Sequence, residues 1–145
     1  MTVLDTTDKP VPIPTQADRP YWDALRERKV VFARCTACGS MTQRLPMVCT
    51  RCRGEAFEWS QVSGGGTIYS FSVARQTWVP AFRHDLPYVV VAVAISEQPS
   101  LVVTTNLVGD YELDELTIGL PVIAEFEPRG EATLLQFRLD RSHRA

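Results

Sequence analysis

Apolar and polar residues alternate along several stretches of the second half of the chain, and a period of two is typical of β-strands with one buried face. The predicted strands cover residues 69–74, 87–95, 101–107, 122–127 and 134–139. In the first strand, Tyr69, Phe71 and Val73 alternate with small polar residues and are expected to share the buried face. The alternation therefore predicts a mainly β protein.

The second predicted strand is apolar on both faces. Val89, Val91, Val93 and Ile95 share one face, and valine and alanine occupy the other. Such a strand must be covered on both sides. Five strands within about 75 residues, with a helical turn predicted at residues 112–116 between the third and the fourth, match the order of an OB-fold barrel. An open five-stranded meander is the alternative.

The first third of the chain has a different pattern. Residues 1–19 contain three prolines and little to bury, which predicts an extended, mobile arm that could lie on a partner. An amphipathic helix follows, with Asp18 as its cap and with Tyr21, Trp22 and Leu25 on one side. Trp22 is expected to pack on the rest of the protein. The three glycines at 64–66 indicate a flexible link or a bend at a barrel corner.

Two Cys-x-x-Cys pairs, separated by ten residues, contain all four cysteines of the chain: Cys35, Cys38, Cys49 and Cys52. Two such pairs can converge on one tetrahedral zinc ion, and four thiolates leave no open position, so the zinc is predicted to be structural. Gly39 and Gly54 suit tight turns in which backbone crowds the sulfurs. Two disulfides, a redox pair and an iron ion are the alternatives.

These patterns predict five segments. They are an arm at 1–19, a helix with a lead-in strand at 20–33, a rubredoxin-like zinc ribbon at 34–63, a five-stranded OB-fold domain at 64–140 and a tail at 141–145.

Arginines crowd the predicted metal site: Arg34, Arg44, Arg51 and Arg53. They could offset the negative charge of a zinc ion held by four thiolates. Alternatively, Arg51 and Arg53 could bind phosphates of a ligand, because guanidinium groups match phosphate oxygens two at a time. The sequence leaves both readings open.

The connection between the first two strands, residues 75–87, is long for a hairpin and is the candidate ligand-binding or partner-binding loop. Its candidate residues are Arg75, Trp78, Phe82, Arg83 and His84. The alternative is that both aromatic rings fold back on the protein. His84 precedes an aspartate and could act as a base, but the loop offers no nucleophile or open metal site.

Net charge is -2, which argues against a general nucleic-acid binder. The longest apolar run, from Tyr88 to Ile95, is far shorter than the ~20 residues of a membrane span, and no signal peptide is recognisable. The expected location is the cytoplasm.

Several short motifs together resemble the zinc-ribbon, OB-fold acyl-CoA-associated family known as domain of unknown function thirty-five, over residues 21–140. They are Trp22 before the metal pair, Cys35-x-x-Cys38-Gly39, Pro46 before Cys49-x-x-Cys52, Gly66-Thr67-Ile68-Tyr69-Ser70-Phe71, Leu86-Pro87-Tyr88, Thr105-Asn106-Leu107-Val108-Gly109 and Ile118-Gly119-Leu120-Pro121-Val122. The chain departs from the family pattern at Thr50, where proline is usual, and at Arg53, where glycine often follows the last cysteine.

The resemblance implies a non-catalytic accessory subunit that helps to bind or channel an acyl-CoA. The implied partner is a thiolase-like enzyme, a lipid-transfer-type aldolase or a MaoC-type hydratase, and a homodimer within a hetero-oligomer is compatible with it. The residues leave two other functions open. One is a module for single-stranded nucleic acid, which uses the same barrel. The other is a free-standing enzyme that depends on His84.

Overall fold

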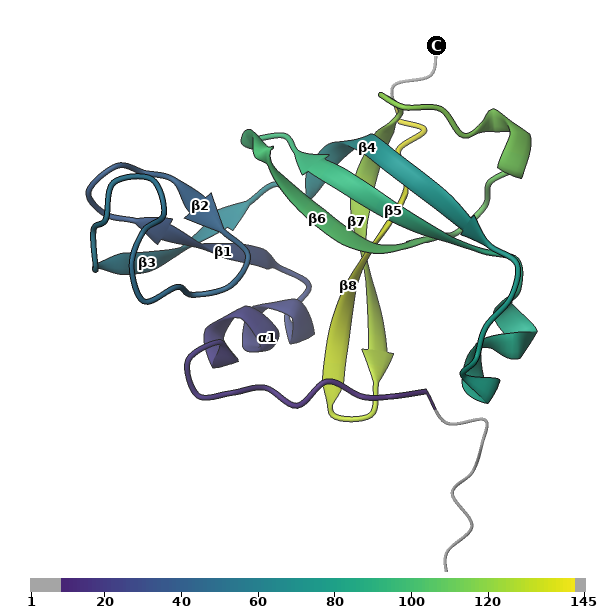
Figure 1. The fold of residues 1–145 in the computed structure, drawn as a ribbon, viewed down its shortest axis with the longest axis horizontal. Coiled ribbons are helices and arrows are strands. Elements are labelled where there is room, and N and C mark those ends of the chain that lie inside the picture. The colour runs from purple at the N-terminus through teal and green to yellow at the C-terminus, as the bar shows by residue number, and fades with distance from the viewer. Residues whose placement is uncertain (1–8, 143–145) are drawn as a thin grey trace, which may run out of the picture.

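Residues 9–142, the part of the chain that this computed structural model describes, form two β-structures joined through one helix (Figure 1). The first is a three-stranded antiparallel sheet in the order β2-β1-β3, which consists of β1 (Val30–Cys35), β2 (Met41–Thr42) and β3 (Phe57–Val62). The second is a closed barrel in the order β4-β5-β6-β8-β7, built from β4 (Gly65–Ala74), β5 (Tyr88–Ile95), β6 (Gln98–Val108), β7 (Pro121–Arg129) and β8 (Ala132–Leu139). Helix α1 (Arg19–Arg26) precedes both, and two 3-10 helices, η1 (Pro80–Asp85) and η2 (Leu113–Glu115), lie in the barrel connections.

Two strand pairings close the barrel. Residues 65–67 of β4 pair antiparallel with residues 121–123 of β7, and β6 pairs in parallel with β8 through Leu107 opposite Phe137. An open meander has neither pairing, so the OB-fold prediction is confirmed and the meander is excluded. The predicted helical turn is also present, as η2.

The inward face of β5 forms the centre of the barrel core. Val89, Val91, Val93 and Ile95 are fully buried there, as their spacing predicted. Val90, Ala92 and Ala94 on the opposite face are only half-buried. The barrel thus covers one face of β5 completely and leaves part of the other accessible.

The prediction for Tyr69 was wrong. The register between β4 and β5 shifts between Ile68 and Ser70, where the strand has a bulge. Because a bulge reverses the phase of the alternation, Ile68 points into the core before it, and Phe71 and Val73 are the residues that pack inward after it. Tyr69 is left 61% exposed.

The three glycines at 64–66 form a bend followed by the start of β4. Gly64 has a φ of 88°, which glycine adopts without strain. Gly66 lies inside the strand, where a Cβ would stand 2.5 Å from Cγ1 of Val93 and 2.6 Å from the carbonyl oxygen of Ala94. The segment is therefore a barrel corner whose last residue has no room for a side chain.

Gly66→Ala is expected to destabilise the protein by about 1–3 kcal/mol, the usual cost of overpacking a tight core. The neighbour at Ala94 is backbone and cannot rotate away. Gly65→Ala is the matched control, because the closest atom to its Cβ would be the movable hydroxyl of Ser96 at 3.3 Å. Urea unfolding of the three proteins measures the difference, and equal stabilities of the two variants would contradict the close approach.

Helix α1 joins the two β-structures. Its buried residues are Tyr21 and Leu25, and Trp22 packs half-buried against the same cluster, edge-on to the Tyr21 ring at 5.2 Å. Asp18 stands at the N-cap, but its carboxylate accepts hydrogen bonds from Thr15 instead of the helix. The helix contacts β1 on one side and β7 and β8 on the other.

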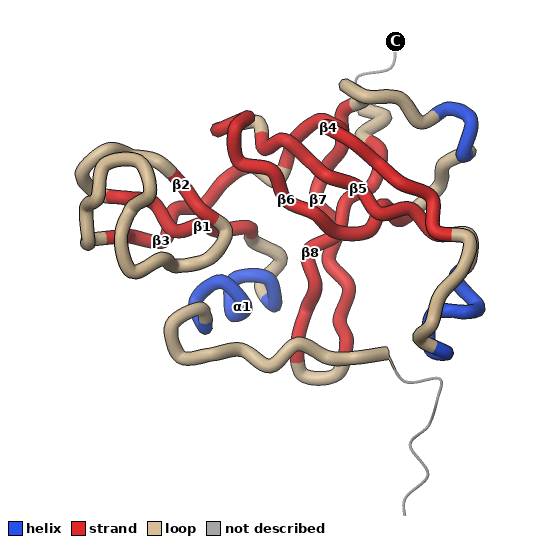
Figure 2. The backbone as a smooth tube through the Cα atoms, in the orientation of Figure 1, coloured by secondary structure: helices blue, strands red, loops and turns tan. Residues whose placement is uncertain are grey.

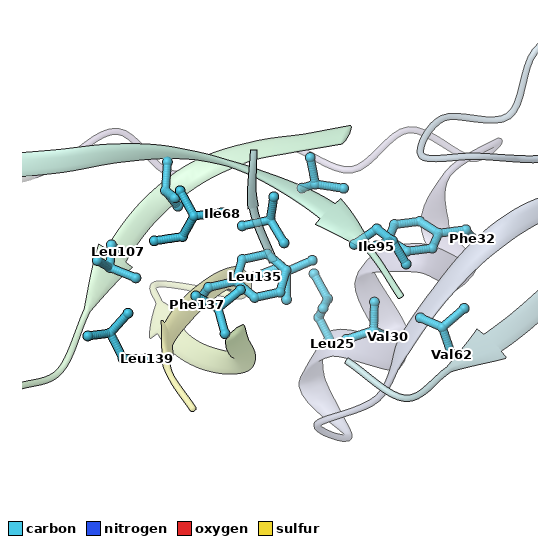
Figure 3. Packing of buried hydrophobic residues seen from close by; sticks show 14 of the residues in the cluster. Leu25, Val30, Phe32, Val62, Ile68, Ile95, Leu107, Leu135, Phe137 and Leu139 are labelled. Carbon is cyan, nitrogen blue, oxygen red and sulfur yellow. The ribbon is translucent and has the colours of Figure 1, made fainter. Parts of the chain in front are cut away.

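One hydrophobic cluster runs through both β-structures. Figure 3 shows Val30, Phe32 and Val62 of the three-stranded sheet beside Leu25, with the barrel residues continuing from Ile95 to Leu135. The two β-structures therefore share a core.

The side chain of Gln98 makes a second link between the two structures. Its amide oxygen accepts a hydrogen bond from the backbone N–H of Met41 at 2.8 Å, and its nitrogen donates to the Met41 carbonyl at 2.9 Å. The turn between β5 and β6 occupies Ser96 and Glu97, and β6 begins at Gln98. Gln98 provides the hydrogen bonds that a further strand would give to β2.

Residues 9–18 of the predicted arm lie along α1 and the β7–β8 hairpin (Figure 1). Lys9 pairs with Asp85 at 2.6 Å, the carbonyl of Pro10 accepts from Arg129, and Val11 lies over Gly130. Residues 1–8, also part of the predicted arm, lie outside the described residues. Within residues 9–142, no helix is long and apolar enough to cross a membrane.

Candidate metal centre and binding surfaces

The structure brings the four cysteines together at the tip of the three-stranded sheet. Their sulfurs all lie within 4.8 Å of one another, with Cys35 to Cys52 at 3.5 Å and Cys38 to Cys49 at 3.6 Å. All four are free thiols, and these distances are far longer than the ~2.05 Å of a disulfide. Ligands about 2.3 Å from a central ion at tetrahedral angles would stand about 3.8 Å apart. The donor set therefore fits a metal ion such as zinc.

Each Cys-x-x-Cys pair lies on a tight turn, and the two turns have the same hydrogen bonds. Cys35 donates from its N–H to the carbonyl of Ser40, and Cys49 donates to Gly54 in the same way. The carbonyls of the two cysteines accept in turn from Gly39 and Arg53, both at 2.8 Å. The first turn ends at β2, and the second lies in the long loop between β2 and β3, drawn as a tan tube in Figure 2.

The geometry of the two turns explains why residues 39 and 54 are glycines and what the arginine at position 53 costs. Gly39 has a φ of 80°, and Arg53, at the equivalent place in the second turn, has a φ of 68°. An arginine in this left-handed region costs roughly 1–2 kcal/mol, which glycine avoids. Gly54 is required for a different reason: a Cβ there would lie 3.1 Å from the Cys35 sulfur and 3.3 Å from the Cys52 sulfur.

Backbone N–H groups point at the sulfurs and favour their ionised form. The N–H groups of Cys52 and Arg51 lower the pKa of Cys49 to about 6. At Cys52 the N–H of Gly54 also favours the thiolate, but the neighbouring sulfurs, Cys35 first, raise the pKa to about 12. Because four thiolates cannot ionise together without a counter-charge, the cluster is suited to a cation.

The charge around the cluster is positive. Residues 34–54 contain four arginines and no acidic residue. The guanidinium of Arg34 lies beside Gly39, with its Nη2 3.4 Å from where a Cβ would be. Arg51 and Arg53 are exposed on the second turn. These cations would offset the negative charge of a metal ion bound by four thiolates, and Arg51 and Arg53 are also accessible to a ligand.

The loop at 75–87 contains η1, which the sequence analysis did not predict, and it treats its two aromatic residues differently. Trp78 is 96% exposed, so its ring does not fold back on the barrel. Phe82 does fold back: its ring lies 6.1 Å from the Tyr88 ring, and the Lys9 ammonium stands 5.6 Å from its centre. The expectation that both aromatic rings fold back on the protein therefore holds for Phe82 and is wrong for Trp78.

The other candidate residues of this loop, Arg75, Arg83 and His84, are exposed. The aspartate beside His84 is paired with Lys9. In Figure 1 this loop and the cysteine turns, which carry Arg51 and Arg53, lie at opposite ends of the molecule. The predicted binding residues thus form two separate groups.

A groove of about 440 Å³ lies beside η1 on the outer face of the barrel, and the sequence analysis missed it. Phe82 and Tyr88 form one wall, and Asn106, Tyr111 and Gln136 are among its other residues. Partial burial raises the pKa of Tyr111, so its hydroxyl stays protonated at neutral pH. These residues come from distant strands, and no local spacing in the sequence connects them.

The chain is similar in sequence to a family model and to a curated protein. The family model described as "ChsH2, C-terminal OB-fold domain" matches residues 59–127. A "Probable enoyl-CoA hydratase alpha subunit" of Thermomonospora curvata is 38% identical over 125 residues, which cover 83% of this chain. The match spans 37% of that longer relative.

Two solved structures share the fold. The chain from the "Ltp2-ChsH2(DUF35) aldolase" has a TM-score of 0.77 and 31% identity, over 89% of this chain and 98% of that one. A DUF35 protein of unknown function from Sulfolobus solfataricus has a TM-score of 0.59 and 12% identity over 86% of each chain, so it supports the fold alone. The four-cysteine cluster, the closed barrel and the 31% identity over nearly all of the ChsH2 chain together show that this chain belongs to the ChsH2-like DUF35 family.

Proposed function

We propose that this chain is a non-catalytic accessory subunit of an enzyme complex that processes acyl-CoA. The observation that carries the proposal is the pairing of a four-sulfur site with an accessible binding loop on one rigid core. The related aldolase and the enoyl-CoA hydratase subunit support it, because both relatives are named as parts of enzymes. In this proposal the chain binds the partner and helps to hold the acyl-CoA, while the partner performs the chemistry.

The proposed metal is a structural zinc ion bound by Cys35, Cys38, Cys49 and Cys52. Four cysteines complete a tetrahedral set, so no position remains for water or substrate. Bound zinc would supply the cross-link that holds the two turns together, a role that suits a loop with little regular structure. The proposed zinc site is thus structural and takes no part in a reaction.

The proposed partner-binding surface is centred on Trp78. A tryptophan that is 96% exposed leaves a large apolar ring in water, and such rings are enriched among the residues that dominate protein interfaces. Arg75 and Arg83 are exposed in the same loop and would supply polar contacts at its rim. The candidate partners are a thiolase-like enzyme, an aldolase or a MaoC-type hydratase.

Co-expression with the acyl-CoA enzymes encoded beside this chain tests the proposed function. The expected result is a stable hetero-oligomer whose turnover exceeds that of the partner alone, with no turnover by this chain alone. If the chain remains separate from every such enzyme and their activity is the same without it, the proposal fails.

Trp78→Ala is expected to weaken partner binding at least about 30-fold, the lower end of the effect of an interface hot spot. Isothermal titration of the purified partner measures it. Tyr69→Ala is the matched control, because Tyr69 is also an exposed aromatic residue but lies on the bulge of β4. Unchanged affinity in Trp78→Ala would remove this loop from the interface.

A further inference from the structure

The groove beside η1 has the features of a small-molecule site. Its volume of about 440 Å³ falls within the range of about 300–1,000 Å³ that such sites occupy. It lies on the outer face of the barrel strands and is flanked by the connection between β4 and β5, the region where OB-folds commonly bind ligands. Its position is distinct from the cysteine turns and from the Trp78 side chain.

Every charged residue that lines the groove is paired within it. Lys9 meets Asp85 at 2.6 Å, and Arg129 meets Glu127 at 2.5 Å. The four charges sum to zero, and both cations already have carboxylate partners. A phosphate placed here would have to compete with a carboxylate for each cation, so the groove is poorly matched to a nucleotide or a nucleic-acid backbone.

The rest of the lining is apolar with a few uncharged hydrogen-bonding groups. Val90 belongs to the half-buried outer face of β5, and Phe82 and Tyr88 stand beside it. Gln136, only 5% exposed, and Asn106 place amides in the same groove. Each amide nitrogen already donates one hydrogen bond, to Glu127 and to the Val89 carbonyl respectively, and has a second hydrogen to donate. A ligand that fits this chemistry is uncharged, has an apolar part and is able to exchange one or two hydrogen bonds.

The arm contributes Lys9 to the lining of the groove. Lys9 is held both by Asp85 and by the face of Phe82, and the Pro10 carbonyl is held by Arg129. Each contact joins the arm to a residue that lines the groove. The arm therefore positions the groove lining directly and forms part of its rim.

We propose that this groove binds the acyl portion of an acyl thioester, with the uncharged thioester end included and the nucleotide phosphates outside. The choice of an acyl thioester as the ligand rests on the proposed function. The choice of its acyl portion as the part that enters the groove rests on the paired charges. The acyl chain or ring of the ligand covers Val90 and packs on Phe82 and Tyr88. The thioester carbonyl of the ligand accepts hydrogen bonds from the side-chain amides of the groove.

The test titrates the isotope-labelled full chain with three probes and follows the side-chain amide signals of Asn106 and Gln136 by NMR. Octanoyl-N-acetylcysteamine is the uncharged thioester, free coenzyme A has the phosphates without an acyl group, and a twelve-residue oligothymidylate represents nucleic acid. We expect saturable shifts with the first probe and none at these two residues with the other two. Shifts there with coenzyme A or the oligonucleotide, or none with the thioester, overturn the proposal.

Phe82→Ala is expected to weaken binding of the uncharged thioester about tenfold, because it removes one apolar wall. Tyr69→Ala is the matched control: it removes an exposed aromatic side chain that lies outside the groove lining. Equal losses in both variants, or none in either, contradict the assignment. The titration uses the chain without a partner, so its failure leaves the co-expression result intact, and failure of co-expression leaves the titration valid.

Discussion

Cys49→Ser is expected to abolish metal binding and to unfold residues 34–56 while the barrel remains folded. Structural zinc sites of this type contribute about 10–16 kcal/mol of apparent binding free energy, which is also folding free energy for the loops that they join. Cys49 is buried, its carbonyl and N–H both hold the second turn closed, and a serine hydroxyl is a poor replacement for a thiolate ligand. We expect one zinc ion per wild-type chain by elemental analysis and none in the variant.

Ala37→Ser is the control for this experiment, because it adds the same hydroxyl to the exposed part of the first turn and removes no sulfur. It should keep the metal. Amide hydrogen exchange would show loss of protection in the two cysteine turns and β2 for Cys49→Ser and little change in β5. A metal-free wild type, or a variant that retains one zinc ion, would disprove the assignment of the ligands.

Leu25→Ala is expected to destabilise the protein by about 2–5 kcal/mol, the usual cost of removing a fully buried leucine. Leu25 is 0% exposed on α1, and this helix packs on β1 and on β8. The cavity would lie between the two β-structures (Figure 3), where neither can close it without moving relative to the other. We therefore also expect the single unfolding transition to split.

Chemical denaturation followed by two probes measures this effect. The change in tryptophan fluorescence reports on Trp22 and Trp59, which pack on the shared cluster, because Trp78 is already exposed in the folded protein. Far-ultraviolet circular dichroism reports on the barrel strands. Arg26→Ala, an exposed position on the same helix, is the control and should change stability by no more than about 0.5 kcal/mol. Coincident transitions with wild-type midpoints in Leu25→Ala would show that the helix does not couple the two structures.

Local patterns in the sequence were sufficient for helix α1, the five barrel strands and the cysteine cluster. The spacing of Val89, Val91, Val93 and Ile95 depends only on the pleat of one strand, and the structure buries all four. The two Cys-x-x-Cys pairs likewise need only two tight turns. The helical residues Tyr21 and Leu25 were also correctly assigned to a buried face.

The features that the sequence analysis missed depend on contacts between distant residues. A bulge at Ile68–Ser70 changed the side on which Tyr69 lies, although the alternation itself was present. The amide of Gln98 pairs with the backbone of Met41, 57 positions away, and no local pattern indicates this contact. The groove combines residues from four strands, a 3-10 helix and the arm, and its neutrality arises from ion pairs that only the folded chain forms.

The parallel pairing of β6 with β8 has a consequence for synthesis on the ribosome. All four cysteines have been made by residue 52, so the metal-binding turns can form early, whereas the barrel lacks its fifth strand until residue 139 has emerged. Until then β4 to β6 present unpaired edges and an uncovered apolar surface, the kind of intermediate that chaperones protect. A nascent chain stalled before β8 should therefore already retain zinc but remain sensitive to protease in β5.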